Sequence, residues 1–220
     1  MATPPNWRQS SQVFDRKAAE YDSWFEESLL FDIELAALKE VKTPLLGPKL
    51  EIGVGPGRFA KETDVAFGVD PAINPLYLSQ KRGIEVIQAT GEDLPMGSSC
   101  MGTVYLLFAL CFLSDPLQVI KESSRVLRGG GHLVLGVIPS LGSWGQSLEE
   151  KKKDGHPFYE YARFYDMIVI ESWLKKAGFQ LVETRSSLFQ SPDSLKEFEH
   201  SRSGASPDAG FWVLVARKSG

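Results

Sequence analysis

The sequence contains little cysteine and little histidine, with two residues of the first and three of the second among 220. Cys100 and Cys111 alone cannot form a disulfide framework, and they are too few for a cysteine-based zinc cluster. No apolar run approaches the roughly 18 residues that span a bilayer, since residues 104–113, the longest candidate, supply about half that length. We therefore expect no bound metal and no membrane span.

The sequence also lacks an excess of positive charge. Its 24 lysine and arginine residues stand against 28 aspartate and glutamate residues, which gives a formal net charge of −4. Such a chain has no general attraction for nucleic acid or for an anionic membrane. The first ten residues lack the basic and then apolar order of a signal peptide. These absences favour a globular cytoplasmic protein that has no nucleic-acid partner.

Short apolar runs alternate with amphipathic stretches along most of the chain. Strands are predicted over residues 50–54, 66–69, 84–87, 103–108, 133–138, 181–184 and 211–216. Helices are predicted over residues 15–22, 24–42, 76–82, 116–127 and 166–177, with three glycines at 129–131 ending the fourth. This alternation is typical of βαβ units, which build a mostly parallel sheet with helices on both faces. The sequence thus predicts one α/β domain with three layers and a seven-stranded sheet, whose last strand is antiparallel.

A glycine-rich turn follows the first predicted strand. Gly53, Gly55 and Gly57 occupy alternate positions, where glycine permits positive φ and close approach of a ligand to the backbone. Arg58 stands where the dinucleotide fingerprint G-x-G-x-x-G needs its third glycine, and no G-K-[ST] of a phosphate-binding loop follows. The carboxylate of Glu51 would repel a pyrophosphate but suits a ligand with an ammonium group. A glycine turn of purely structural purpose is the alternative.

Acidic residues follow the next two predicted strands. Asp70 ends the second strand, where a carboxylate can accept hydrogen bonds from both hydroxyls of a ribose. The loop 90–95 follows the third strand, and its backbone and side-chain oxygens are placed to contact an adenine edge. Both segments have a plainer interpretation, because Asp70 with Pro71 is a common turn sequence and 90–95 can be an ordinary acidic turn.

Together these motifs resemble the class I S-adenosylmethionine-dependent methyltransferases, and most of all the small-molecule subgroup similar to the ubiquinone and menaquinone methyltransferases. The family's acidic residue followed by G-x-G-x-G is matched by Glu51 and the three glycines, and its ribose-binding acid by Asp70. Its E-x-L-P loop is matched at residues 92–95, and its exit from the fourth strand at 108–116. The resemblance implies a Rossmann-like fold and S-adenosylmethionine as cofactor, without a metal. It implies cofactor contacts from Glu51, Gly53, Gly55, Gly57, Asp70, Pro71, Gly91, Glu92, Asp93, Leu94 and Phe108.

Two departures from the family pattern affect what can be carried over. Thr90 stands where the family commonly has an aspartate near the adenine amino group. Cys111 and Phe112 stand where some relatives have a histidine, so no general base can be carried over. The catalytic group therefore stays unassigned, with His156 and Tyr21 as candidates.

The acceptor side is predicted from the distribution of aromatic residues. Residues 1–45 are expected to form an N-terminal helical lid, and residues 140–165 an insertion beside the acceptor. Aromatic side chains in both segments suit a planar or cationic acceptor. An accessory helix whose aromatic residues pack on the core is the alternative for the insertion. The substrate candidates are Tyr21, Trp24, Trp144, Phe158 and Tyr159.

The function predicted from the sequence is in-line transfer of a methyl group from S-adenosylmethionine to a small molecule, with S-adenosylhomocysteine as product. An oxidoreductase that uses NAD is one alternative, opposed by Glu51 and Arg58. A regulatory protein that binds the cofactor without turnover is another, and no residue excludes it. A methyl group on sulfonium is already electrophilic, so no catalytic side chain exists whose absence would reveal such a protein.

Overall fold

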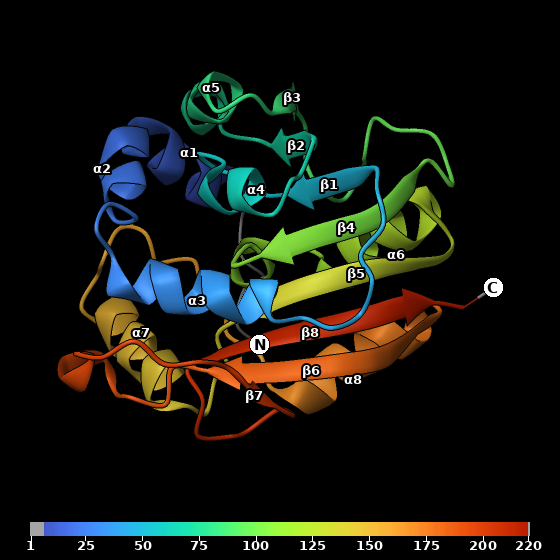
Figure 1. Cartoon of the computed structure of the whole chain (residues 1–220). Coiled ribbons are helices and arrows are strands. Elements are labelled where there is room, and N and C mark those ends of the chain that lie inside the picture. Colours follow the sequence, from blue (N-terminus) through green and yellow to red (C-terminus); the bar gives the residue numbers. More distant parts are fainter. Residues whose placement is uncertain (1–6, 220) are drawn as a thin grey trace.

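The computed structural model describes residues 7–219, which form one mixed β-sheet flanked by helices (Figure 1). The strands are β1 Lys49–Ile52, β2 Phe67–Asp70, β3 Glu85–Gln88, β4 Met101–Leu107, β5 Leu127–Val137, β6 Phe179–Ser187, β7 Arg202–Ser203 and β8 Phe211–Lys218. Their order across the sheet is β3-β2-β1-β4-β5-β8-β6-β7. Strands β1 to β5 pair in parallel, whereas β8 is antiparallel to both of its neighbours, β5 and β6. The predicted antiparallel final strand is thereby confirmed.

The prediction of seven strands was wrong, because the sheet has eight. The additional strand β7 has two residues and pairs with β6 through Arg185 opposite Ser203 and Ser186 opposite Arg202. A pair of exposed polar residues shows no alternation of apolar and polar positions, so β7 leaves no periodic signal in the sequence. It lies at the edge of the sheet, within the polar segment that returns the chain from β6 to β8.

The helices are α1 Trp7–Arg16, α2 Ala18–Ser23, α3 Leu29–Lys39, α4 Arg58–Glu62, α5 Ile73–Lys81, α6 Pro116–Val126, α7 Ser143–Lys153 and α8 Met167–Lys176, with 3₁₀ turns at Leu110–Phe112 and Pro192–Ser194. Two helices are predicted before residue 43, whereas the structure has three in the described part of this segment. The break before α3 occurs at Glu27, whose φ is +49°, and Ser28 then caps α3 by accepting a hydrogen bond from the Phe31 amide. The glycines at 129–131 lie inside β5 instead of ending α6.

Two other helix boundaries agree with the signals in the sequence. Asp115 caps α6 by accepting a hydrogen bond from the Gln118 amide, and Pro116 occupies the first turn. Gly178 follows α8 with a φ of +79°, the left-handed conformation that glycine adopts after a helix. Local chemistry alone therefore placed both helices to within a residue or two.

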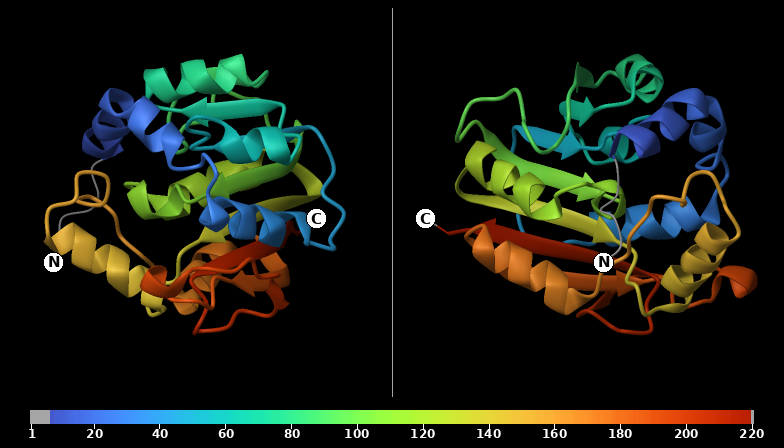
Figure 2. Two further views of the ribbon diagram at one scale, coloured as in Figure 1. Left: turned by 60° about the vertical axis from the view of Figure 1, so that its left-hand side comes forward. Right: turned by 180° about the vertical axis from the view of Figure 1, so that it is seen from behind.

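Apolar side chains that alternate along the strands form a separate core on each face of the sheet. In β4, Val104 and Leu106 pack into one core with residues of α6 and α8, whereas Tyr105 and Leu107 pack into the other with residues of α3, α4 and α5. Figure 2 shows α6 and α8 on one side of the sheet and α3 on the other. These layers confirm the predicted α/β architecture.

The parallel strands bring the predicted motifs to one edge of the sheet. Leu50 of β1 pairs with Phe67 of β2 and with Val104 of β4, so the ends of these three strands are adjacent. Helices α1, α2 and α7 lie on the side at which β1 and β4 end (Figure 1). Residues 1–6 of the predicted lid lie outside the described residues.

Candidate active site

A pocket lies beyond the carboxyl ends of β1, β2 and β4. It contains about 960 Å³ of space, part of which is open to solvent. Helices α1 and α2 supply part of its wall, and the loops after the three strands supply most of the rest. The residues predicted to contact the cofactor or the substrate that line this pocket are Tyr21, Glu51, Gly53, Gly55, Asp70, Pro71, Gly91, Glu92 and Phe108.

The glycine turn has the backbone conformation that its composition suggests. Gly53, Gly55 and Gly57 have φ values of +72°, +52° and +79°. A Cβ atom on Gly53 would lie 2.5 Å from the Cβ of Ala109, whereas one on Gly55 would meet only the Tyr21 ring, at 3.7 Å. Gly57 is not part of the pocket wall, and a Cβ there would lie 2.6 Å from the Ser79 hydroxyl. Close packing against α5 therefore explains why position 57 is a glycine.

Glu51 presents a buried carboxylate to the pocket. The residue is 3% exposed, and its Oε2 atom has no hydrogen-bond partner among the described residues. Burial raises the pKa of Glu51 well above its usual value, and the nearby charge of Asp70 raises it further. An unpaired carboxylate oxygen in this position fits a ligand that brings an ammonium group, which would supply the missing donor.

Asp70 connects the end of β2 with the glycine turn. Its Oδ2 accepts a hydrogen bond from the Gly55 amide at 3.0 Å, and its Oδ1 accepts one from the Ala72 amide at 2.8 Å. Burial raises the pKa of Asp70 to about 6 even though these two hydrogen bonds oppose the shift. Each oxygen keeps a further lone pair, so the carboxylate can also accept hydrogen bonds from two hydroxyl groups.

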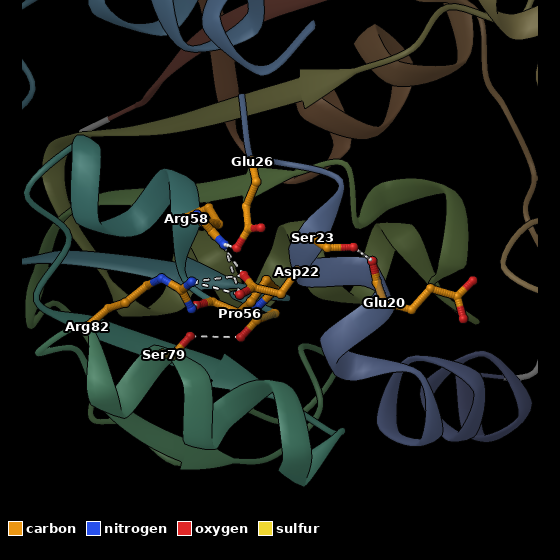
Figure 3. A network of polar contacts seen from close by, with 9 residues as sticks. Glu20, Asp22, Ser23, Glu26, Pro56, Arg58, Ser79 and Arg82 are labelled. Atoms are coloured by element: carbon orange, nitrogen blue, oxygen red, sulfur yellow. Dashed lines mark hydrogen bonds and ion pairs between the residues drawn. The ribbon is translucent and has the colours of Figure 1, made fainter. Parts of the chain in front are cut away.

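An ion-pair network attaches α2 to the glycine turn (Figure 3). The Asp22 carboxylate accepts hydrogen bonds from Arg58 at 2.7 and 2.9 Å and from Arg82 at 3.0 and 2.8 Å. Arg82 also donates to the Pro56 carbonyl at 2.8 Å. Burial opposes ionisation of Asp22, but the two guanidinium groups outweigh it and hold its pKa below the usual value. The helix that carries Tyr21 is thereby fixed against the pocket.

Known proteins are similar to this chain in sequence and in fold. A family described as "Methyltransferase domain" matches residues 50–135. A crystal structure from Thermotoga maritima, described as a SAM-dependent methyltransferase and possible histamine N-methyltransferase, is 31% identical with a TM-score of 0.88, covering 96% of this chain and 100% of that one. This chain belongs to the S-adenosylmethionine-dependent methyltransferases. The oxidoreductase alternative is thereby set aside.

Two further relatives of this methyltransferase differ in what they indicate. An uncharacterized protein of Methanocaldococcus jannaschii is 36% identical over 94% of this chain and 98% of its own length. A ubiquinone/menaquinone biosynthesis C-methyltransferase of Syntrophotalea carbinolica is 29% identical over 56% of this chain and 58% of its own length. The predicted family is therefore confirmed, whereas the predicted subgroup is supported only loosely.

Several residues predicted for the methyltransferase site lie outside the pocket wall. Asp93 is exposed, and Leu94 is buried in the core with its amide donating to Glu122 at 2.9 Å. Trp144 lies in α7, donates its indole N–H to the Gln190 carbonyl at 2.8 Å and packs against Gly210. The structure therefore does not bring Trp144 together with the other substrate candidates.

The remaining aromatic candidates meet where α2 and the segment after α7 come together. The Trp24 ring lies 5.4 Å from Tyr21, 4.7 Å from Phe158 and 6.5 Å from Tyr159, measured between centroids. The His156 ring lies tilted against that of Tyr159, with 5.0 Å between the centroids, and burial lowers the pKa of His156. Tyr21 is the member of this group that also lines the pocket.

Ser10 is a pocket residue that the sequence analysis missed. It is 4% exposed, and its hydroxyl has no hydrogen-bond partner among the described residues, although it lines the pocket. Ser10 lies on the face of α1 between Trp7 and Phe14, both of which also line the pocket. Ser10 follows Trp7 by three positions and precedes Phe14 by four, a spacing that puts all three residues on one face of a helix. This spacing is the signal that could have identified Ser10.

Lowering the pH from about 7.5 to about 5 is expected to weaken the binding of S-adenosylhomocysteine about tenfold. A ribose hydroxyl donates to an ionised carboxylate, and Asp70, with a pKa of about 6, is largely protonated at the lower pH when no ligand is bound. Calorimetric titrations across this range measure the dissociation constant. Asp70→Asn cannot titrate at this position and should show a shallower decline. A dissociation constant that does not change with pH would contradict the assignment.

Proposed function

We propose that this methyltransferase transfers the methyl group to a small-molecule acceptor by in-line displacement. The observation that carries the proposal is the aromatic group formed by Tyr21, Trp24, Phe158 and Tyr159 beside the cofactor pocket. Tyr21 connects these packed aromatic rings with the pocket wall, and such rings suit a compact acceptor.

The pocket residues support the proposed mode of cofactor binding. When bound, S-adenosylmethionine supplies a methyl group on a positively charged sulfur. Glu51 would bind the amino group of the cofactor through its unpaired carboxylate oxygen, and Asp70 would bind the ribose hydroxyls. The loop at Gly91 and Glu92, with Phe108, would enclose the adenine. The unpaired oxygen of Glu51 supports the fit of these residues to the group, as does Gly55, where an added Cβ would meet only the Tyr21 ring at 3.7 Å.

The chain's own contribution to the reaction is positioning and exclusion of water. Transfer requires the acceptor atom to be held near about 3 Å from the methyl carbon and in line with the bond that breaks. Tyr21 and Phe108 lie in the pocket wall and would restrict the acceptor to one approach. Phe108 is held in place by stacking on Phe211 at 4.9 Å and has a φ of +58°, which is unusual for a residue with a side chain.

The proposal is tested by measuring S-adenosylhomocysteine formation with four acceptor classes: amines, phenols, thiols and quinone precursors. Turnover on at least one small molecule, together with micromolar or tighter cofactor binding in calorimetry, is the expected result. Cofactor binding without turnover on any acceptor would favour a regulatory protein instead. Turnover on bulk transfer RNA and on no small molecule would contradict the small-molecule assignment.

A further inference from the structure

Ser10 carries a buried hydroxyl that the fold itself does not use. The residue is 4% exposed, and its Oγ atom has no hydrogen-bond partner among the described residues. Ser79 and Ser123, the other buried serines of the described helices, donate to the Gly55 carbonyl at 2.7 Å and to the Val119 carbonyl at 2.8 Å. A buried hydroxyl without a partner opposes folding, because it has lost its hydration without a replacement. Packing alone is therefore a poor explanation for a serine at this position.

Helix α1, which carries Ser10, is attached to the rest of the protein near both of its ends. At its first residue, the Trp7 amide donates a hydrogen bond to the Ser114 hydroxyl at 3.1 Å. Near its last residue, the Asp15 carboxylate accepts one from the Asn74 amide at 2.8 Å. Ser114 lies in the segment that leaves β4, and Asn74 lies in the first turn of α5, which follows β2. Helix α1 therefore extends between these two segments, and Ser10 lies between the two attachments.

Both attachments of α1 are beside the loops proposed to hold the nucleoside of the cofactor. Ser114 lies close to the start of α6, where the Gln118 side chain donates to the carbonyl of Glu92, a pocket residue, at 3.3 Å. Asn74 follows Asp70, the proposed ribose ligand, by four positions. The glycine turn is instead attached to α2, through the ion-pair network of Figure 3. Ser10, which itself lines the pocket, is therefore on the nucleoside side of it.

We infer that the Ser10 hydroxyl forms a hydrogen bond with the adenosine portion of S-adenosylmethionine, which makes α1 part of the cofactor site. This inference rests on the proposed function, because it uses the position proposed there for the cofactor. A hydroxyl both donates and accepts, and adenosine offers partners of both kinds on its base and on its ribose. The bound nucleoside thus supplies the partner that Ser10 lacks. Ser10 is a binding residue in this assignment and takes no part in the transfer step.

The test compares two ligands that share the nucleoside. S-adenosylhomocysteine carries adenosine and an amino acid, whereas methylthioadenosine carries adenosine without the amino acid. In calorimetric titrations, Ser10→Ala is expected to weaken the binding of both ligands by the same factor, about fivefold, through loss of one hydrogen bond. Unchanged affinity for both ligands, or a loss confined to one of them, overturns the inference. Failure of the wild-type protein to bind methylthioadenosine also overturns it, since the nucleoside contacts would then be too weak to hold a ligand.

Ser23→Ala is the matched control, because it makes the same substitution in the neighbouring helix α2. Ser23 is exposed and outside the pocket wall, and its hydroxyl already donates to the Glu20 carbonyl at 2.8 Å (Figure 3). We expect this variant to bind both ligands within about twofold of the wild-type protein. A loss in Ser23→Ala as large as that in Ser10→Ala overturns the inference, because the effect would then not depend on the pocket.

Thermal unfolding separates a binding role of Ser10 from a structural one. Without ligand, the melting temperature of Ser10→Ala is expected to be equal to or above that of the wild type, because the substitution removes a buried hydroxyl that has no partner. At one fixed concentration of S-adenosylhomocysteine, the rise in melting temperature should be smaller in the variant, since a ligand that binds less tightly stabilises less. A lower melting temperature without ligand, together with an unchanged rise on binding, overturns the inference.

The same titrations with Asp70→Ala separate this inference from the proposed function. If Asp70→Ala weakens the binding of both ligands and Ser10→Ala weakens neither, the proposed position of the cofactor stands and only the role of Ser10 is overturned. If neither variant weakens the binding of either ligand, the nucleoside lies elsewhere, and the proposed mode of cofactor binding is overturned together with the inference.

Discussion

Asp70→Ala is expected to weaken S-adenosylhomocysteine binding about 30-fold, which corresponds to about 2 kcal/mol. The Asp70 carboxylate is buried at the pocket wall and has lone pairs available beyond its two backbone hydrogen bonds. Hydrogen bonds from hydroxyl groups to an ionised acceptor are among the stronger polar contacts in proteins. Calorimetry at about pH 7.5, where the carboxylate is ionised, measures the change.

The effect of this substitution on folding should be smaller than its effect on binding. The variant loses the acceptor for the Gly55 and Ala72 amides, but it also removes a carboxylate whose burial raises its pKa to about 6. These two contributions have opposite signs in the free energy of unfolding. A thermal unfolding curve close to that of the wild type would therefore show that weaker binding does not result from partial unfolding.

Asp93→Ala is the matched control for Asp70→Ala. Both residues are acidic and both were predicted from the sequence to contact the cofactor, but Asp93 is exposed and outside the pocket wall. We expect its dissociation constant to remain within about twofold of the wild-type value, as is usual for an exposed position. A large loss with Asp93→Ala and none with Asp70→Ala would show that the ribose lies at the other loop.

The sequence was most informative where function depends on a few neighbouring residues. Glu51, Gly53 and Gly55 lie in one turn, and Asp70 joins them because the parallel strands β1 and β2 end side by side. The position of Asp70 beside the glycine turn agrees with the general rule that ligands bind beyond the carboxyl ends of parallel strands. Short-range patterns and one rule of topology therefore sufficed to identify the acidic residues and the glycines that line the pocket.

The sequence was less informative about contacts between distant segments. Trp24 and Trp144 look alike as aromatic residues in amphipathic stretches, yet Trp24 packs on Phe158 whereas Trp144 hydrogen-bonds to Gln190. That difference depends on how the segment after α7 folds back against α2, and no local periodicity encodes it.

Arg58 is another example of such a distant contact. In the sequence it stands out because it replaces a glycine of the dinucleotide fingerprint. In the structure its guanidinium pairs with Asp22, 36 positions away, and Arg82 reaches the same carboxylate across 60 positions. Arg58, which argues against NAD as the cofactor, thus helps to attach α2 to the glycine turn. Only the structure reveals this second role.

Asp22→Ala is expected to lower the free energy of unfolding by about 3 kcal/mol, at the lower end of the range for breaking a buried ion pair. The side chains of Asp22, Arg58 and Arg82 are 14%, 22% and 18% exposed, so both guanidinium groups would lose a partner in a largely buried place. For a domain of this size the melting temperature should fall by roughly 6–12 °C. Cofactor binding should weaken as well, because α2 also carries Tyr21 to the pocket wall.

Glu20→Ala is the control for this substitution, since Glu20 lies in the same short helix and forms an ion pair with Lys17. That pair is exposed, with 39% and 51% of the two side chains accessible, so its loss should change the free energy of unfolding by less than about 1 kcal/mol. If Asp22→Ala were as stable as Glu20→Ala, the network could not be what fixes α2. If Asp22→Ala were unstable but bound S-adenosylhomocysteine normally, α2 would contribute to folding and not to the pocket.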